Sequence, residues 1–237
     1  MKILCIGNSF SQDAASYLSR AAKNQKIDIY VENLYIGGCS LERHYNNMIS
    51  GEKAYELEVC GESTHTSISL SEALEKEKWD VVTVQQASYF SAFYSTYQPF
   101  ANDLVSFIRR KQPDAKVYVH QTWAYEENSQ RLFDNGFTAR SEMFAKIKES
   151  YALALKDCAA DGLIPSGQVL ENMAARGLKC HRDTFHASLG AGRYALSLTW
   201  IKALTGADIN ENSFSDTAEL LSADDIDKIK ESVNEAF

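Results

Sequence analysis

Short apolar runs alternate along this chain with longer segments whose apolar positions recur every three or four residues. The runs are rich in β-branched and aliphatic residues, which is typical of buried strands. The longer segments have the spacing of amphipathic helices. Strands are expected over 2–7, 27–35, 80–86, 116–122 and 163–167. Helices are expected over 11–24, 41–49, 69–78, 101–112, 137–160, 168–176, 191–206 and from Ser222 onward.

This order of elements indicates the fold class. Apolar strands separated by helices predict an α/β protein with a parallel five-stranded sheet covered by helices on both faces. The polar segment 50–67 fits no element and is expected to form a hairpin or a loop excursion. With 237 residues, 45% of them hydrophobic, and only three prolines, the chain is expected to form a single domain over 1–237.

Residues that can take part in catalysis or ligand binding cluster just after the predicted strands. In open parallel sheets, ligands bind at the carboxyl ends of the strands. Ser9, Gly38, Gln85, Gln86 and Trp123 follow strand ends in this way. A late loop with Asp183 and His186 can return to the same edge. These positions predict one shared site.

Ser9 and the Asp183-Thr184-Phe185-His186 segment can together supply a nucleophile, a base and an orienting acid. A serine hydroxyl needs a base at neutral pH, and His186 is the only histidine with an acid at a suitable spacing. Alone, Gly7-Asn8-Ser9 is also typical of a turn, and the Asp/His pair of a helix cap. Their joint occurrence favours acyl-transfer chemistry.

These segments resemble the sequence blocks of SGNH (GDSL-type) hydrolases. The matching segments are Gly7-Asn8-Ser9-Phe10-Ser11, Gly37-Gly38-Cys39-Ser40, Val84-Gln85-Gln86-Ala87-Ser88 and Asp183-x-x-His186. Thr122-Trp123-Ala124-Tyr125 is similar to a bacterial branch of largely unknown function. The resemblance implies a flavodoxin-like three-layer α/β/α sandwich and a serine esterase with a triad of Ser9, His186 and Asp183. It also implies an oxyanion hole that includes the backbone N–H groups of Ser9 and Gly38.

The sequence departs from the family pattern at two places. Gly-Asn-Ser replaces the usual Gly-Asp-Ser, which keeps the nucleophile. The oxyanion asparagine after the third strand is absent, and Gln85-Gln86 stands there instead. A glutamine offers the same amide donors on a longer stem. We therefore expect Gln86, or else Gln85, to complete the oxyanion hole, with Gln86 favoured because it lies nearer the loop.

Aromatic residues follow two of the predicted strands and can line a substrate pocket. The residues concerned are Tyr89, Phe90, Trp123 and Tyr125, and packing of these loops against the core is an equal alternative. By analogy with the family, the substrate is expected to be a small acyl ester, such as an acetyl ester on a carbohydrate. A non-catalytic small-molecule or carbohydrate-binding protein on the same fold is the alternative function. A phosphate binder is less favoured, because the first strand–helix turn has only Gly7 and no GxGxxG pattern.

Charge and composition restrict the other partners. The net charge of −8 argues against nucleic acid. The apolar run before Ser9 is too short for a signal peptide, and no run is long enough for a membrane span, so a cytoplasmic location away from membranes is expected. The five cysteines show no CxxC pair, and His44, His65, His120 and His181 lack metal spacing. No metal or cofactor is expected, and the oligomeric state stays open.

Overall fold

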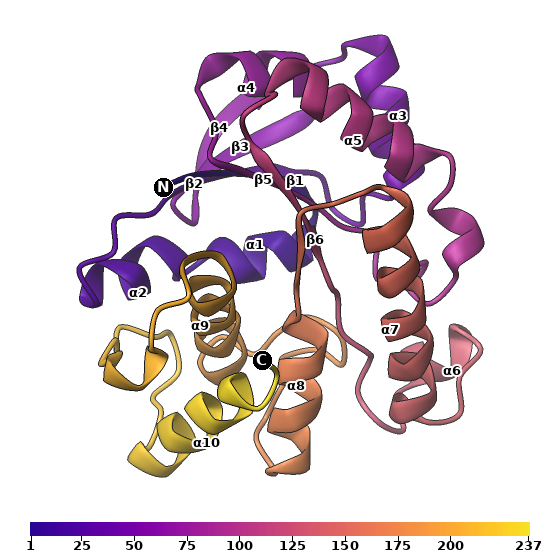
Figure 1. Cartoon of the computed structure of the whole chain (residues 1–237). Coiled ribbons are helices and arrows are strands. Elements are labelled where there is room, and N and C mark those ends of the chain that lie inside the picture. Colours follow the sequence, from indigo (N-terminus) through magenta and orange to yellow (C-terminus); the bar gives the residue numbers. More distant parts are fainter.

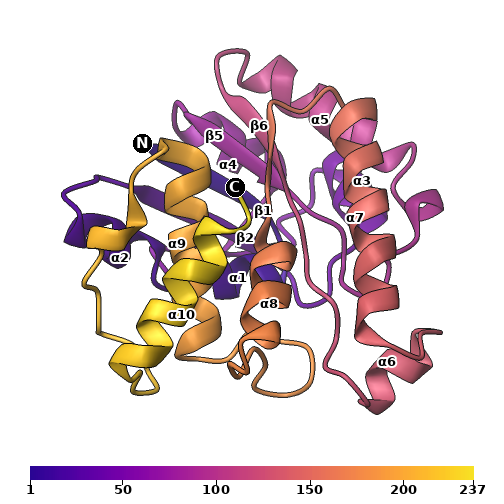
Figure 2. The ribbon, with the colours of Figure 1, turned by 60° about the horizontal axis from the view of Figure 1, so that its bottom comes forward.

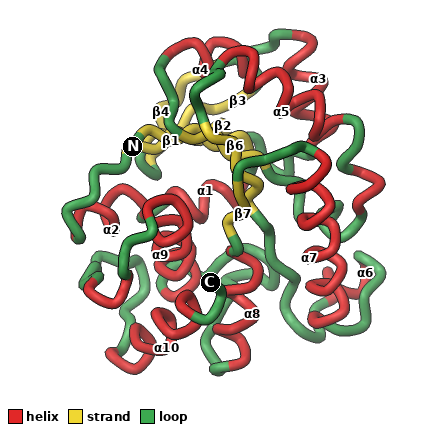
Figure 3. The backbone as a smooth tube through the Cα atoms, viewed as in Figure 1, coloured by secondary structure: helices red, strands yellow, loops and turns green.

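A twisted seven-stranded sheet forms the centre of the computed structural model, which describes residues 1–237 (Figures 1 and 3). Five strands run parallel, and two antiparallel strands extend one edge in the order β4-β3-β2-β1-β5-β6-β7. The strands are β1 (Lys2–Gly7), β2 (Tyr30–Tyr35), β3 (Tyr55–Val59), β4 (Glu62–Ile68), β5 (Val81–Val84), β6 (Lys116–His120) and β7 (Gly162–Ile164).

The five predicted strands are present, but the prediction of a purely parallel five-stranded sheet is wrong in count. Segment 50–67 forms the β3–β4 hairpin that pairs with β2 and makes the sheet mixed. Its sequence hides these strands because β4 is an exposed edge strand with almost no buried side chain. β3 does alternate, with the apolar Tyr55, Leu57 and Val59 packed against the core and the acidic Glu56 and Glu58 between them. This alternation covers only five residues, which leaves segment 50–67 polar overall.

The parallel strands have the spatial order β2-β1-β5-β6-β7, which is the flavodoxin-like order 2-1-3-4-5. After β2, the chain returns across β1 and adds β5 on the other side, so Ile3 pairs with both Val31 and Val81. The crevice for a ligand in such a sheet lies where this order reverses, at the carboxyl ends of β1 and its neighbours.

Helices cover both faces of the sheet, as Figures 1 and 2 show. One face carries α3 (Leu41–Ser50), α4 (Leu70–Lys76), α5 (Phe100–Lys111) and α7 (Arg140–Asp157). The other carries α1 (Ser9–Ala15), α2 (Leu18–Asn24), α8 (Ser166–Ala175), α9 (Ala191–Thr205) and α10 (Ala223–Asn234). The remaining short elements are η1 (Tyr94–Thr96), α6 (Gln130–Asp134) and η2 (Ile209–Glu211). None of the helices has the length and apolar character required to cross a bilayer.

Each face has its own apolar core because successive residues of a strand point to opposite sides. In β1, Leu4 and Ile6 pack under the α3–α7 layer, while Ile3 and Cys5 pack under the α1–α9 layer. All four side chains are buried. The three-layer α/β/α architecture therefore agrees with the expected one.

The helix expected over 11–24 differs in a way that matters for the site. It begins two residues earlier, at Ser9, and is divided into α1 and α2 around Tyr17. The N-cap is Asn8, whose side chain accepts a hydrogen bond from Phe10 N, while Ser11 Oγ accepts one from Asn8 N. The cap places Ser9 at the first position of α1, directly after the strand.

Candidate active site

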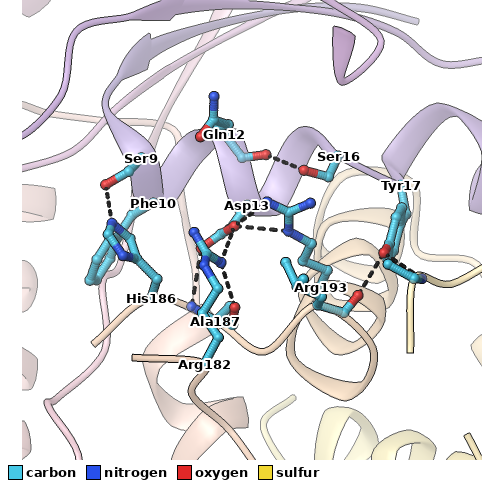
Figure 4. Close-up of polar contacts among 12 residues, drawn as sticks. Ser9, Phe10, Gln12, Asp13, Ser16, Tyr17, Arg182, His186, Ala187 and Arg193 are labelled. Atoms are coloured by element: carbon cyan, nitrogen blue, oxygen red, sulfur yellow. Dashed lines mark hydrogen bonds and ion pairs between the residues drawn. The ribbon is translucent and has the colours of Figure 1, made fainter. Parts of the chain in front are cut away.

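Ser9, His186 and Asp183 form one chain of hydrogen bonds at the carboxyl end of β1, and Figure 4 shows the contact between Ser9 and His186. Ser9 Oγ lies 2.8 Å from His186 Nε2, and His186 Nδ1 lies 2.7 Å from Asp183 Oδ2. An ionised carboxylate only accepts hydrogen bonds, so Nδ1 carries the proton and Nε2 accepts from the serine hydroxyl. The imidazole is thus oriented as a base toward Ser9.

Asp183 is held in the ionised form that this tautomer requires. Burial acts to raise the pKa of Asp183, but the hydrogen bonds that the carboxylate accepts from His186 outweigh burial and hold this pKa below the ordinary value. Asp183 also accepts a 2.9 Å hydrogen bond from His186 N. The tight turn between the two residues places Thr184 at a φ of +75°, a left-handed conformation that β-branched residues rarely adopt.

A second carboxylate, Asp13, connects the nucleophile helix to the loop that carries the base (Figure 4). Asp13 lies one turn along α1 from Ser9 and is fully buried. It accepts hydrogen bonds from Arg182 Nη1 at 2.8 Å, Arg193 Nε at 2.9 Å and Ala187 N at 3.1 Å. Because Arg182 and Ala187 flank Asp183 and His186, this carboxylate fixes both ends of the loop against α1.

The backbone N–H groups of Ser9 and Gly38 are candidate donors to an oxyanion, because both residues line the cavity that contains the serine hydroxyl. Ser9 is the first residue of α1, so its N–H has no acceptor one turn earlier. Gly38 has a φ of +61°, and its carbonyl accepts a 3.0 Å hydrogen bond from the Tyr89 hydroxyl. Asn8 Nδ2 donates to Cys39 O at 3.0 Å, which fixes the loop next to Gly38.

Neither glutamine is brought to the serine, contrary to the expectation from the sequence. The Gln86 amide nitrogen donates to Thr96 O at 3.0 Å, and Oε1 accepts from the backbone N–H of Leu41 and Ala87. Gln85 Nε2 donates to Asn8 Oδ1 at 2.7 Å. The amide of Gln86 thus bridges buried loops, whereas Gln85 supports the residue before Ser9.

Gln85 is itself oriented by a buried histidine. Gln85 Oε1 accepts from His120 Nδ1 at 2.7 Å, and His120 Nε2 lies 2.9 Å from Ser166 Oγ. Burial lowers the pKa of His120 to about 3, so the ring is neutral. A single hydrogen-bonded series therefore runs from Ser166 through His120 and Gln85 to Asn8.

The aromatic residues divide between pocket and core. Tyr89 is 39% exposed and lines the cavity with Ser9, while Tyr125 lines an adjoining cavity. Trp123 is fully buried, stacks on Phe10 at 4.0 Å and donates to Phe185 O at 2.7 Å. Phe90 packs against the Tyr89 ring at 4.5 Å and lines neither cavity. The expectation that Trp123 and Phe90 face a ligand is not met.

The cavity beside Ser9 has a volume of about 300 Å³ and a mixed polar and aromatic lining. The pattern of the sequence did not single out four of its residues: Tyr35, Ser88, Arg131 and Phe185. Tyr35 ends β2 and Ser88 follows β5, so the strand-end rule that pointed to Ser9 also applies to them. Arg131 comes from the short helix α6, which has no comparable signal. No group of three or more His, Cys, Asp or Glu side chains is placed to bind a metal.

Comparison with solved structures shows that the fold is that of the SGNH hydrolases. A protein from Slackia heliotrinireducens, described as a candidate SGNH hydrolase, is 22% identical with a TM-score of 0.63 over 86% of this chain and 98% of its own. The acetylxylan esterase Axe2 from Geobacillus stearothermophilus is 13% identical with a TM-score of 0.57 over 90% of this chain and 94% of its own.

The chain belongs to the DUF4886 family, whose model, described as a domain of unknown function, matches residues 2–232. A DUF4886 family protein from Bacteroides uniformis is 34% identical, and its crystal structure superposes with a TM-score of 0.93. That match covers 100% of this chain and 94% of the other. No curated protein matches the sequence.

Proposed function

We propose that the protein is a serine esterase that hydrolyses small acyl esters through an acyl-enzyme. The observation that carries the proposal is the hydrogen-bonded series from Ser9 through His186 to Asp183. It combines a nucleophile, a base in the required tautomer and an ionised acid at an open cavity.

Each group has one role in the proposed reaction. Ser9 Oγ attacks the ester carbonyl while His186 Nε2 takes the hydroxyl proton. The N–H groups of Ser9 and Gly38 stabilise the negative oxygen of the tetrahedral intermediate. His186 then protonates the departing alcohol, and a water molecule activated by the same nitrogen releases the acid from Ser9. Asp183 stabilises the imidazolium that forms during both acylation and deacylation of Ser9.

The size and lining of the cavity support a small acyl group, such as acetyl. About 300 Å³ must hold the reacting part of the substrate, and this space is lined by Tyr35, Tyr89 and Phe185 together with polar groups. Aromatic rings beside hydrogen-bonding groups also suit a carbohydrate alcohol. A fold relative named as an acetylxylan esterase agrees with this substrate class.

The test compares hydrolysis of p-nitrophenyl acetate by the wild type, Ser9→Ala and a Ser71→Ala control. Ser71 is a half-buried residue of α4 that does not line the cavity with Ser9. Removing a triad nucleophile is expected to lower kcat by about 10⁴-fold or more. A fluorophosphonate probe should label the wild type at Ser9. A folded protein with no Ser9-dependent turnover and no label would contradict the esterase and favour the non-catalytic binding protein.

A further inference from the structure

Arg131 places a cation without a carboxylate partner at the junction of two cavities. The cavity that contains Ser9 and His186 is lined in part by Arg131 and Tyr89. The same two residues line an outer cavity of about 580 Å³, together with Tyr125, Gln130 and Thr184. A ligand that reaches from Ser9 into the outer cavity therefore passes the Arg131 side chain.

Aromatic rings hold the guanidinium in place. Its central carbon lies 3.7 Å from the centroid of the Phe185 ring and 5.8 Å from that of Tyr125. The Phe185 ring in turn lies 3.8 Å from the His186 ring, so a single aromatic ring separates the cation from the base. Stacking of this kind restricts the guanidinium, and its N–H edge can still bind a planar anion.

Three arginines, Arg43, Arg110 and Arg131, form no ion pair, and of these only Arg131 lines either cavity. Arg109, Arg140 and Arg176 all form ion pairs with acidic side chains. Arg131 forms none, although Asp134 lies one turn later on the same helix and lines the same outer cavity. The Asp134 carboxylate instead accepts a 2.8 Å hydrogen bond from Gln130.

We propose that Arg131 binds a carboxylate on the alcohol part of the substrate, so that the preferred esters are anionic. This inference rests on the proposed esterase function and specifies its substrate class. A guanidinium matches a carboxylate with two parallel hydrogen bonds. The alcohol part is the one concerned, because the larger cavity that Arg131 lines contains neither Ser9 nor His186.

The experiment measures kcat/KM for 4-acetoxybenzoate and for its neutral methyl ester. The two esters differ in charge at one position, and the ratio of their kcat/KM values is compared between enzymes so that their intrinsic reactivities cancel. In Arg131→Gln this ratio should fall by about tenfold, the lower range for a hydrogen bond to a charged group. Arg131→Lys keeps the positive charge without the planar guanidinium, so its ratio should lie between those of the wild type and Arg131→Gln.

Arg20→Gln is the matched control, because Arg20 also lies over aromatic rings, those of Tyr17 and Phe214, but lines neither cavity. Its ratio should stay within about twofold of the wild-type ratio, as expected for an exposed charge. Asp134→Asn should raise the ratio by removing a negative charge from the outer cavity. If the ratio in Arg131→Gln equals the wild-type ratio and turnover still depends on Ser9, the inference about Arg131 is wrong while the esterase proposal stands.

A binding measurement separates this inference from the esterase proposal. Calorimetric titration of Ser9→Ala with 4-hydroxybenzoate and its methyl ester needs no turnover. We expect tighter binding of the anion, and loss of that preference when Arg131→Gln is added. If neither ester is hydrolysed in a Ser9-dependent manner, the esterase proposal fails. Equal binding of the acid and the methyl ester would then refute the Arg131 site as well.

Discussion

Replacing Asp13 by asparagine should destabilise the fold and impair the site at the same time. Asp13 is 0% exposed and accepts from two guanidinium groups and the Ala187 N–H. Asparagine keeps one acceptor oxygen but turns an NH₂ group toward donors that need an acceptor. The two arginines then lose the charge that compensates their burial.

The magnitude follows from how buried the partners are. Breaking a buried ion pair by removing one partner costs about 3–5 kcal/mol. The side chains of Arg182 and Arg193 are 24% and 20% exposed, so part of this loss is recovered by water. We expect a loss of about 3 kcal/mol in the free energy of unfolding, the lower end of that range. At a typical urea m-value, the midpoint should fall by about 1 M.

The assay is urea unfolding at pH 7, combined with kcat for p-nitrophenyl acetate under conditions in which the variant stays folded. Displacing the His186 loop relative to Ser9 should lower kcat by about 10- to 100-fold, as small misplacements of catalytic groups do. The control is Asp216→Asn, whose partner Arg20 is exposed, so its stability should change by less than about 1 kcal/mol. A midpoint and kcat for Asp13→Asn equal to those of the control would refute the reasoning.

Two further predictions concern the support of the site and its response to pH. Asn8→Asp restores the aspartate of the usual Gly-Asp-Ser block but turns a carboxylate oxygen toward Cys39 O, which in the wild type accepts a 3.0 Å hydrogen bond from Asn8. The substitution should lower the free energy of unfolding by about 1–3 kcal/mol and should also lower kcat. A variant as stable and as active as the wild type would show that this hydrogen bond is unimportant. Burial lowers the pKa of His44, His120 and His181 to about 3 in the folded protein, from an ordinary value of 6.5. Between these two pH values the three imidazoles are therefore protonated only in the unfolded chain. Stability should therefore fall as the pH drops below about 6.5, by up to about 1.4 kcal/mol per pH unit for each histidine; constant urea midpoints between pH 7 and 5 would contradict this.

The layer architecture was predictable because its signals are local. The central strands β1 and β5 are buried on both faces, so each appears as a short apolar run, as Val81–Val84 does. The rule that loops meet at the carboxyl ends of parallel strands then placed Ser9 and Gly38 at one edge. The Asp183/His186 spacing is also local, and the structure brings both residues to Ser9.

The features that the sequence did not reveal depend on distant contacts or on side-chain direction. Whether Gln86 turns toward Ser9 or toward Thr96 depends on the path of the loop after β5, which no local pattern specifies. Asp13 and Arg182 are 169 positions apart, and nothing near either residue predicts the ion pair. Arg131 lies on a five-residue helix whose position relative to the sheet is set by tertiary packing.

The separation of Ser9 and His186 by 177 positions has a consequence for biosynthesis. A chain still emerging from the ribosome can contain β1 and α1, and thus the nucleophile, long before the segment with Asp183 and His186 is made. Such long-range contacts form slowly, because closing a large loop costs entropy before any contact compensates for it. Ser9 should therefore stay unreactive toward fluorophosphonate in nascent or early-refolding chains. Its labelling would then report the last docking step, in which the loop after α8 closes onto α1.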